Sequence, residues 1–137
     1  METYAASRVP REELRIFVKI EKVVQKMAKV ELEKNKQMSC HLLARALARF
    51  FPVECRDGYF GKCNKHSWLV TKTGNIIDSY PVAVIGGPLF IDMKSITPWL
   101  SLYNECPLPE LNDAGFLADV VKVTEVVRKT MLTLGIQ

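Results

Sequence analysis

The chain has little that would carry it into or across a membrane. No apolar run approaches the roughly 18 residues that span a bilayer. The N-terminal residues lack a basic flank followed by an apolar core, which is the pattern of a secretory signal. We therefore expect a cytoplasmic protein with no membrane partner, while export by a specialised machine stays open.

The sequence also lacks the short motifs that hold nucleotides and catalytic metals. It contains no phosphate-binding loop, no dinucleotide-binding glycine motif and no His-Glu-x-x-His. The net charge is +4, but lysine and arginine are concentrated between Arg8 and Lys36, interleaved with glutamates. Such a run is typical of a solvated helix face rather than a nucleic-acid interface. We expect no cofactor and no nucleic-acid partner.

No internal repeat and no linker divides the chain, and 137 residues suffice to bury a core. The sequence therefore predicts a single domain over residues 1–137. Its four cysteines could form two disulfides, but without a secretory signal we expect them to stay reduced.

Two helices are predicted in the first part of the chain. Between Arg11 and Lys34 apolar residues recur at helical spacing: Leu14, Phe17, Val18, Ile20, Val23, Val24, Met27 and Val30. Ser39 then has the character of an N-cap, with Cys40 in the first turn of a helix that ends at Phe51–Pro52. We expect this helix to bury Leu42, Leu43, Ala46, Leu47 and Phe50, and to expose Arg45 and Arg49.

The middle of the chain predicts short strands, separated by turns that contain glycine. The strand-like runs are PVEC, GYF, HSWLV and NIIDSY, with another over Val82–Ile85 and Leu89–Ile91. A short helix is predicted from Thr97–Pro98 to Asn104.

A last helix should begin at Asn112 or Asp113 and bury Phe116, Leu117, Val120, Val123, Val126, Val127 and Met131. The predicted class is α+β: N-terminal helices pack on a small antiparallel sheet, which the C-terminal helix closes.

Cys40, His66 and Asp78 form a candidate thiol site. The thiolate is the nucleophile, and an ordinary cysteine is mostly protonated at pH 7. A helix N-terminus and a neighbouring imidazolium both favour the thiolate at Cys40. A carboxylate that orients the imidazole completes a triad. Adjacent His41 is the poorer partner, because consecutive helical side chains point about a hundred degrees apart.

The hairpin between the last two residues of this triad provides a test. Side chains alternate along each strand, so His66 and Asp78 share a face only if the loop has an odd number of residues. A loop of Lys72–Thr73–Gly74 pairs Trp68 with Asp78 and sets His66 diagonal to it. A two-residue turn would place His66 and Asp78 on opposite faces. The triad therefore requires the odd loop, or a bulge that restores parity.

An acyl-transfer site also needs donors for the developing oxyanion. The amide of Cys40 at the helix start can supply one donor. The side chain of Gln37, or that of Asn35, is the candidate for the second, on sequence proximity alone.

The stretch from Ser39 to Pro81 resembles the core of the transglutaminase-like branch of the papain-like cysteine enzymes. The matching elements are Ser39-Cys40-His41, His66-Ser67-Trp68-Leu69 and Ile76-Ile77-Asp78-Ser79-Tyr80-Pro81. The resemblance implies Cys40 as nucleophile, His66 as general base and acid, and Asp78 as the orienting carboxylate. It implies a papain-like core and a peptidase, amidase or acyltransferase acting on a protein or peptide. Trp68 and Tyr80 are the candidate substrate contacts.

This chain departs from the family pattern at two points. His41 stands where the family usually has an aromatic residue, and two residues separate Asp78 from Pro81. A retired enzyme on the same fold therefore stays open. So does a non-catalytic module that binds a protein partner through Tyr59, Phe60, Trp68, Tyr80 and Gly86–Gly87.

A structural zinc site is the other alternative. Cys55, Cys63 and His66, with Cys40 as fourth ligand, have the donor atoms of a Cys₃His centre. Their spacing lacks the close Cys-x₂-Cys pair that makes such a prediction specific. The oligomeric state is not predicted.

Overall fold

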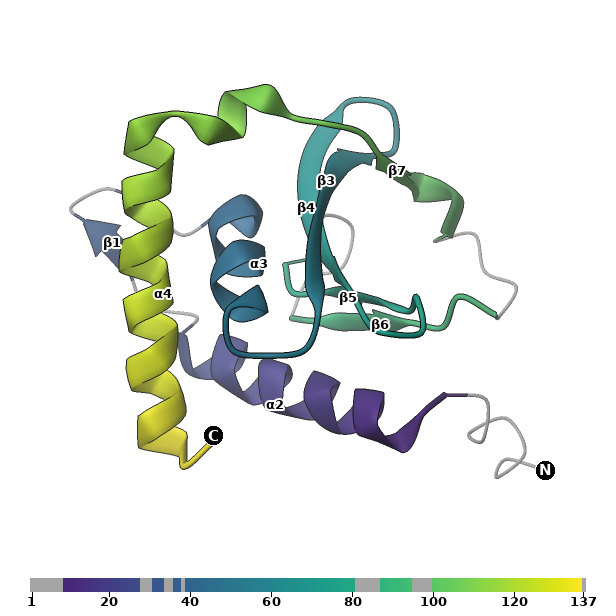
Figure 1. Ribbon diagram of the computed structural model, residues 1–137, viewed down its shortest axis with the longest axis horizontal. Coiled ribbons are helices and arrows are strands. Elements are labelled where there is room, and N and C mark those ends of the chain that lie inside the picture. The colour runs from purple at the N-terminus through teal and green to yellow at the C-terminus, as the bar shows by residue number, and fades with distance from the viewer. Residues whose placement is uncertain are drawn as a thin grey trace.

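The computed structural model describes residues 9–27, 31–33, 36–37, 39–80, 87–94 and 100–136. Three α-helices pack against a five-stranded antiparallel sheet, which confirms the α+β class (Figure 1). The helices are α2 (Arg11–Met27), α3 (Cys40–Ala48) and α4 (Ala114–Leu134). The sheet has the order β6-β5-β4-β3-β7, with β3 (Glu54–Phe60), β4 (Asn64–Val70), β5 (Ile76–Asp78), β6 (Leu89–Ile91) and β7 (Tyr103–Glu105).

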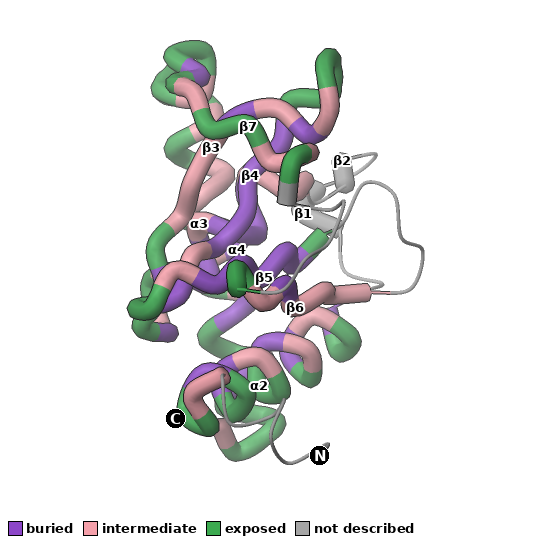
Figure 2. The backbone as a smooth tube through the Cα atoms, turned by 90° about the vertical axis from the view of Figure 1, so that its right-hand side faces the viewer, coloured by how far each residue is buried: buried purple, intermediate pink, exposed green. Residues whose placement is uncertain are grey.

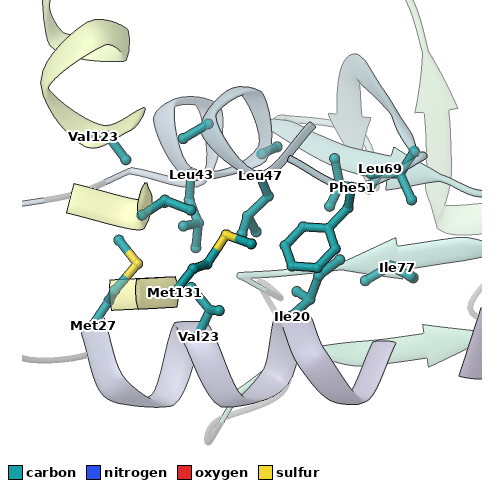
Figure 3. Packing of buried hydrophobic residues seen from close by; sticks show 14 of the residues in the cluster. Ile20, Val23, Met27, Leu43, Leu47, Phe51, Leu69, Ile77, Val123 and Met131 are labelled. Carbon is teal, nitrogen blue, oxygen red and sulfur yellow. The ribbon is translucent and has the colours of Figure 1, made fainter. Parts of the chain in front are cut away.

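The main core lies where the three helices meet one face of the sheet. Figure 3 shows side chains of α2, α3 and α4 packed together, with Leu69 of β4 and Ile77 of β5 at one side of the cluster. The fully buried members include Ile20, Val23, Met27, Leu47, Leu69, Ile77 and Val127. Figure 2 shows that burial continues along β4 and β5. These two strands hold His66 and Asp78, so the candidate site is built on the most buried part of the sheet.

The first helix is shorter than its sequence pattern predicts. It ends at Met27, and Glu31–Glu33 forms a strand, β1, that pairs with β2 (Lys36–Gln37). After Met27 the apolar residues Val30 and Leu32 alternate with polar ones, which is the period of a strand rather than of a helix. Leu14 and Val18 are also 37% and 44% exposed.

The second helix begins as predicted. The backbone N–H of Leu42 donates to Ser39 Oγ at 3.3 Å, so Ser39 is the N-cap and Cys40 is the first helical residue. The helix ends at Ala48, with Arg49 as its C-cap. Its predicted apolar face is buried, with Phe50 only partly so. Cys40 is therefore held at a helix N-terminus.

The prediction of a short helix that ends at Asn104 is wrong. Leu100–Leu102 forms one 3₁₀ turn, and Tyr103–Glu105 is strand β7 on the edge beside β3. Gly58 of β3 makes this pairing close, because a Cβ there would lie 2.1 Å from the carbonyl oxygen of Asn104. Val82–Ile85 and Thr97–Pro98 lie outside the described residues.

The last helix begins at its predicted cap. The N–H of Phe116 donates to Asp113 Oδ1 at 2.8 Å, and Gly135 ends the helix in the left-handed conformation. Val123, Val127 and Met131 are buried, but Leu117 is 50% exposed. Leu117 lies about a quarter-turn away from the row that packs on the core. Among the helices in the described part of the chain, none combines the length and apolar character needed to cross a membrane.

Candidate active site

His66 and Asp78 meet on one face of the sheet. The β4–β5 register pairs Leu69 with Ile77 and Val70 with Ile76, and the N–H of Thr71 donates to the carbonyl of Asn75. The remaining loop is Lys72–Thr73–Gly74, so the odd loop required by parity is present. His66 Nε2 lies 2.8 Å from Asp78 Oδ2, and both side chains are completely buried.

The Asp78 carboxylate has three hydrogen-bond donors. Besides His66, the hydroxyl of Tyr103 donates to Oδ2 at 2.6 Å, and the N–H of Tyr80 donates to Oδ1 at 3.1 Å. Burial and the neighbouring carboxylate raise the pKa of Tyr103, so its hydroxyl stays protonated as a donor. Because a carboxylate can only accept, Nε2 of His66 carries the hydrogen of their contact. The remaining nitrogen, Nδ1, is the one that can exchange a proton.

Aromatic rings surround His66. Its ring centroid lies 6.1 Å from that of Phe60, 6.1 Å from that of Trp68 and 6.3 Å from that of Tyr103. Trp68 is only 2% exposed and packs with Ile76 and Ile91, so its ring supports the imidazole and offers almost no surface to a substrate. Tyr80 is 48% exposed, and its contact with substrate stays a prediction.

Cys40 is half-buried beside two imidazoles, those of His41 and His66. Burial by itself raises the pKa of Cys40, but hydrogen bonding from His41 and His66 outweighs it and lowers the pKa to about 6. Burial also opposes the charge on His66, yet Asp78 and the Cys40 sulfur raise its pKa to about 9. Between these two values the pair is a thiolate and an imidazolium.

The second ring nitrogen of His66, Nδ1, is buried and has no hydrogen-bond partner among the described residues. The His66 side chain nevertheless lies near enough to Cys40 for each group to shift the pKa of the other. Since Asp78 occupies Nε2, Nδ1 is the atom left for the thiolate.

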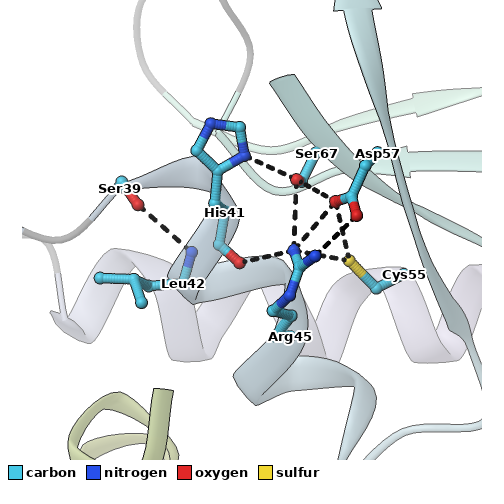
Figure 4. Close-up of polar contacts among 7 residues, drawn as sticks. All are labelled: Ser39, His41, Leu42, Arg45, Cys55, Asp57 and Ser67. Atoms are coloured by element: carbon cyan, nitrogen blue, oxygen red, sulfur yellow. Dashed lines mark hydrogen bonds and ion pairs between the residues drawn. The ribbon is translucent and has the colours of Figure 1, made fainter. Parts of the chain in front are cut away.

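A second polar network lies on the opposite face of β4, beside α3. Arg45 donates to both carboxylate oxygens of Asp57, at 2.9 and 2.6 Å, and the hydroxyl of Ser67 donates to Asp57 Oδ1 at 2.6 Å. His41 Nδ1 lies 2.7 Å from Ser67 Oγ. Figure 4 shows these four side chains pointing toward one another.

This network overturns two expectations from the sequence. Arg45 does not simply meet solvent, since its side chain is only 22% exposed and forms a bidentate ion pair. His41 is not a poor partner for Cys40, because it is one of the two imidazoles that lower its pKa. Adjacent helical side chains can converge at a first turn when a neighbouring strand holds one of them, as Ser67 holds His41.

The zinc alternative is wrong for these residues. In the β3–β4 register Cys55 pairs with Leu69 and Gly58 pairs with His66, so Cys55 and His66 point to opposite faces of the sheet. Cys63 is exposed in the turn between the strands. Within the described ranges no three Cys, His, Asp or Glu side chains are placed to hold a metal ion. Burial raises the pKa of Cys55 to about 12, so this thiol stays protonated.

The oxyanion donors are only partly described. Cys40 opens α3, and the first amides of a helix have no intrahelical acceptor. Gln37 belongs to β2, but its side chain lies outside what the structure describes, and Asn35 lies outside it altogether.

Tyr103, Arg45, Asp57 and Ser67 are the members of the site that sequence reasoning missed. Tyr103 was placed in a helix, and Asp57 beside Gly58 has the pattern of a turn. Of these four residues, only Ser67 had a sequence pattern that predicted its place. Side chains alternate along a strand, so the hydroxyl of Ser67 and the imidazole of His66 lie on opposite faces of β4.

Comparisons with protein-family models, curated proteins and solved structures find no match for this chain. The function of the site is therefore inferred from its geometry alone.

Proposed function

We propose that this chain is a thiol-dependent acyl-transfer enzyme in which Cys40 is the nucleophile, His66 the general acid and base, and Asp78 the orienting carboxylate. The observation that carries the proposal is the fully buried 2.8 Å contact between His66 and Asp78, with Cys40 at a capped helix start beside the imidazole. Burying an ionisable imidazole and carboxylate costs desolvation free energy, and such buried, perturbed pairs are concentrated at functional sites. The order Cys, His, Asp supports the resemblance to a papain-like, transglutaminase-like core.

The reaction would proceed through a thioester on Cys40. The thiolate attacks an amide or thioester carbonyl, the C–N or C–S bond breaks, and His66 gives its Nδ1 proton to a leaving amine. Asp78 and the Tyr103 hydroxyl hold the ring throughout. The free amides at the start of α3, and the partial positive charge of that helix end, would stabilise the oxyanion. Water or an amine then releases the acyl group.

The substrate class we propose is a protein or peptide. An accessible amide or thioester is the group that such a thiolate attacks, and nothing about the site selects hydrolysis over transfer. A nucleophilic thiol must stay reduced, so we propose the cytoplasm as the compartment.

Labelling with iodoacetamide at pH 7 tests the nucleophile. A thiol with a pKa of about 6 is mostly thiolate at this pH, whereas Cys55, with a pKa near 12, is not. We expect fast modification of Cys40, mapped by peptide mass spectrometry, and its slowing by at least about tenfold in His66→Ala. Cys63→Ser is the matched control, because Cys63 is exposed in the turn between β3 and β4.

The outcome also separates the enzyme from a binding module. If Cys40 reacts no faster than Cys63, or if Cys40→Ala leaves the function of the chain in cells intact, the enzyme proposal fails and a pseudoenzyme is favoured. Phe60 and Trp68, which the binding-module hypothesis needs at the surface, are 6% and 2% exposed. That hypothesis therefore retains only Tyr59 and Tyr80 among its aromatic contacts.

A further inference from the structure

A short chain of contacts joins the neighbours of the proposed nucleophile and the proposed base. His41 directly follows Cys40 in α3. Ser67 directly follows His66 in β4. His41 Nδ1 lies 2.7 Å from Ser67 Oγ. Since consecutive Cα atoms are only about 3.8 Å apart, this contact restrains how far the first turn of α3 can move from His66.

The Ser67 hydroxyl has a partner both for its hydrogen and for a lone pair. Burial opposes the charge on Asp57, but hydrogen bonds from Arg45 and Ser67 outweigh it and lower the pKa of this carboxyl. An ionised carboxylate only accepts, so Ser67 Oγ donates its one hydrogen to Asp57 Oδ1, at 2.6 Å. His41 Nδ1 is therefore the donor toward Ser67 Oγ. Ser67 is completely buried, so its hydroxyl is fixed between these two partners.

Arg45 ties the same turn of α3 to strand β3. Its guanidinium donates to both carboxylate oxygens of Asp57, at 2.9 and 2.6 Å, and to the backbone carbonyl of His41 at 3.3 Å. Asp57 lies directly opposite Ser67 in the β3–β4 register. A bidentate arginine–carboxylate pair fixes orientation as well as distance. Figure 4 shows the guanidinium linked to the His41 carbonyl and to the Asp57 carboxylate. We call Arg45, Asp57 and Ser67 the Asp57 cluster.

A restraint at the start of α3 matters for the proposed chemistry. Helix α3 has nine residues, and the end turns of a helix open more readily than its centre. The first turn holds Cys40, and His66 favours its thiolate only at close range. A displacement of about 1 Å at a reacting group can cost roughly a hundredfold in rate.

We propose that the Asp57 cluster positions the nucleophile, by holding the first turn of α3 against β3 and β4 so that the Cys40 sulfur faces His66. This rests on the proposed function. The cluster acts through His41, by the hydrogen bond to its Nδ1 and the hydrogen bond to its carbonyl oxygen. Its three members are therefore positioning residues, and no step of the reaction passes through them.

Asp57→Asn distinguishes positioning from electrostatics, because the two predict opposite shifts. Removing a negative charge near a thiol favours its thiolate, so a purely electrostatic role lowers the pKa of Cys40. Loss of the bidentate pair instead frees the helix start, and the pKa of Cys40 should rise from about 6 toward the ordinary value of about 8.5. The pH dependence of iodoacetamide alkylation, in a Cys63→Ser, Cys106→Ser background, measures this pKa.

Ser67→Ala removes the link to His41 without changing any charge. The pKa of Cys40 should rise in this variant as well. p-Nitrophenyl acetate, which releases nitrophenolate as it acetylates Cys40, should then react on the order of tenfold more slowly at pH 7, because less thiolate is present. Arg45→Lys keeps the positive charge but loses the planar fork, and should shift the pKa in the same direction. It decides the question if neither of the other variants folds, as judged by circular dichroism.

Ile20→Val is the matched control for stability. Ile20 is completely buried in α2, and the loss of one methyl group weakens the core while leaving every hydrogen bond of the Asp57 cluster in place. Cys40 should keep its pKa of about 6 in this variant. A shift as large as that of Ser67→Ala would show that any loss of stability disturbs the site, and would overturn the inference.

An unchanged or lowered pKa of Cys40 in any folded variant of the Asp57 cluster, while the wild type is alkylated and acetylated rapidly, overturns this inference and leaves the proposed function standing. Failure of the wild-type protein to become acetylated on Cys40 overturns both proposals.

Discussion

Glu13 accepts a 2.6 Å hydrogen bond from the hydroxyl of Thr71, a residue 58 positions further along the chain. The same carboxylate accepts from the N–H and hydroxyl of Thr73, at 3.2 and 2.8 Å, and from the Asn75 amide at 2.9 Å. Glu13 is only 3% exposed. A buried carboxylate of α2 therefore fixes the loop whose odd length places His66 and Asp78 together.

Glu13→Gln should destabilise the fold. One carboxylate oxygen becomes an NH₂ group that faces donors, so at least one charge-assisted hydrogen bond is lost and a donor is left unpaired. We expect a loss of about 1–3 kcal/mol in the free energy of unfolding, measured by urea denaturation. Glu12→Gln, one residue away and exposed, should change little. Equal stability of both variants would show that the loop holds its shape without Glu13.

The same carboxylate predicts an acid-sensitive stability. Burial raises the pKa of Glu13, but its hydrogen bonds from Thr71, Asn75 and Thr73 outweigh this and lower it. The resulting stabilisation is complete above the ordinary glutamate pKa of about 4.3 and is lost as pH falls through the lower pKa of the folded state. Melting temperatures measured between about pH 5 and pH 3 should fall more steeply for the wild type than for Glu13→Gln.

The reactivity of Cys40 should depend on pH in two ways. With pKa values of about 6 for Cys40 and about 9 for His66, alkylation should rise through pH 6 and level off, and kcat/KM should fall again above pH 9. In His66→Ala the alkylation curve should move toward the ordinary thiol pKa of about 8.5. Stopped-flow alkylation in a Cys63→Ser, Cys106→Ser background measures both. An unmoved curve in His66→Ala would exclude the ion pair.

Tyr103→Phe removes one donor from the buried Asp78 carboxylate without changing the shape of the ring. The hydroxyl donates at 2.6 Å to the same oxygen that His66 contacts. Hydrogen bonds to charged groups contribute roughly 1.5–3 kcal/mol, so we expect a stability loss of that order and lower acyl-transfer activity. Thermal denaturation and nitrophenolate release measure the two effects. Tyr59→Phe, on β3 and only partly buried, is the control.

Local patterns in the sequence predicted the helix caps and the β4–β5 hairpin. Ser39 and Asp113 cap their helices because a short polar side chain precedes an apolar period at each position. Counting residues across one glycine turn showed which loop would bring His66 and Asp78 together, and the structure has that loop. These features depend only on neighbours in the chain, which is why they could be predicted.

Contacts between distant segments could not be predicted in this way. Tyr103 joins Asp78 because β7 pairs with β3, an alignment that no spacing in the sequence specifies. Arg45 was expected on a solvated face, since an arginine on the polar side of a helix gives no sign of a carboxylate on a later strand. The burial of Glu13 could not be predicted either, because a glutamate in a first helical turn usually faces water.

His66 and Ser67 are successive residues of β4 that turn to opposite sides of the sheet. A slip of that strand by a single position would exchange them, leaving a hydroxyl against Asp78 and an imidazole against Asp57. During refolding, the proposed acyl-transfer activity should therefore appear only with the final alignment of the strands, and a chain that has merely collapsed should lack it.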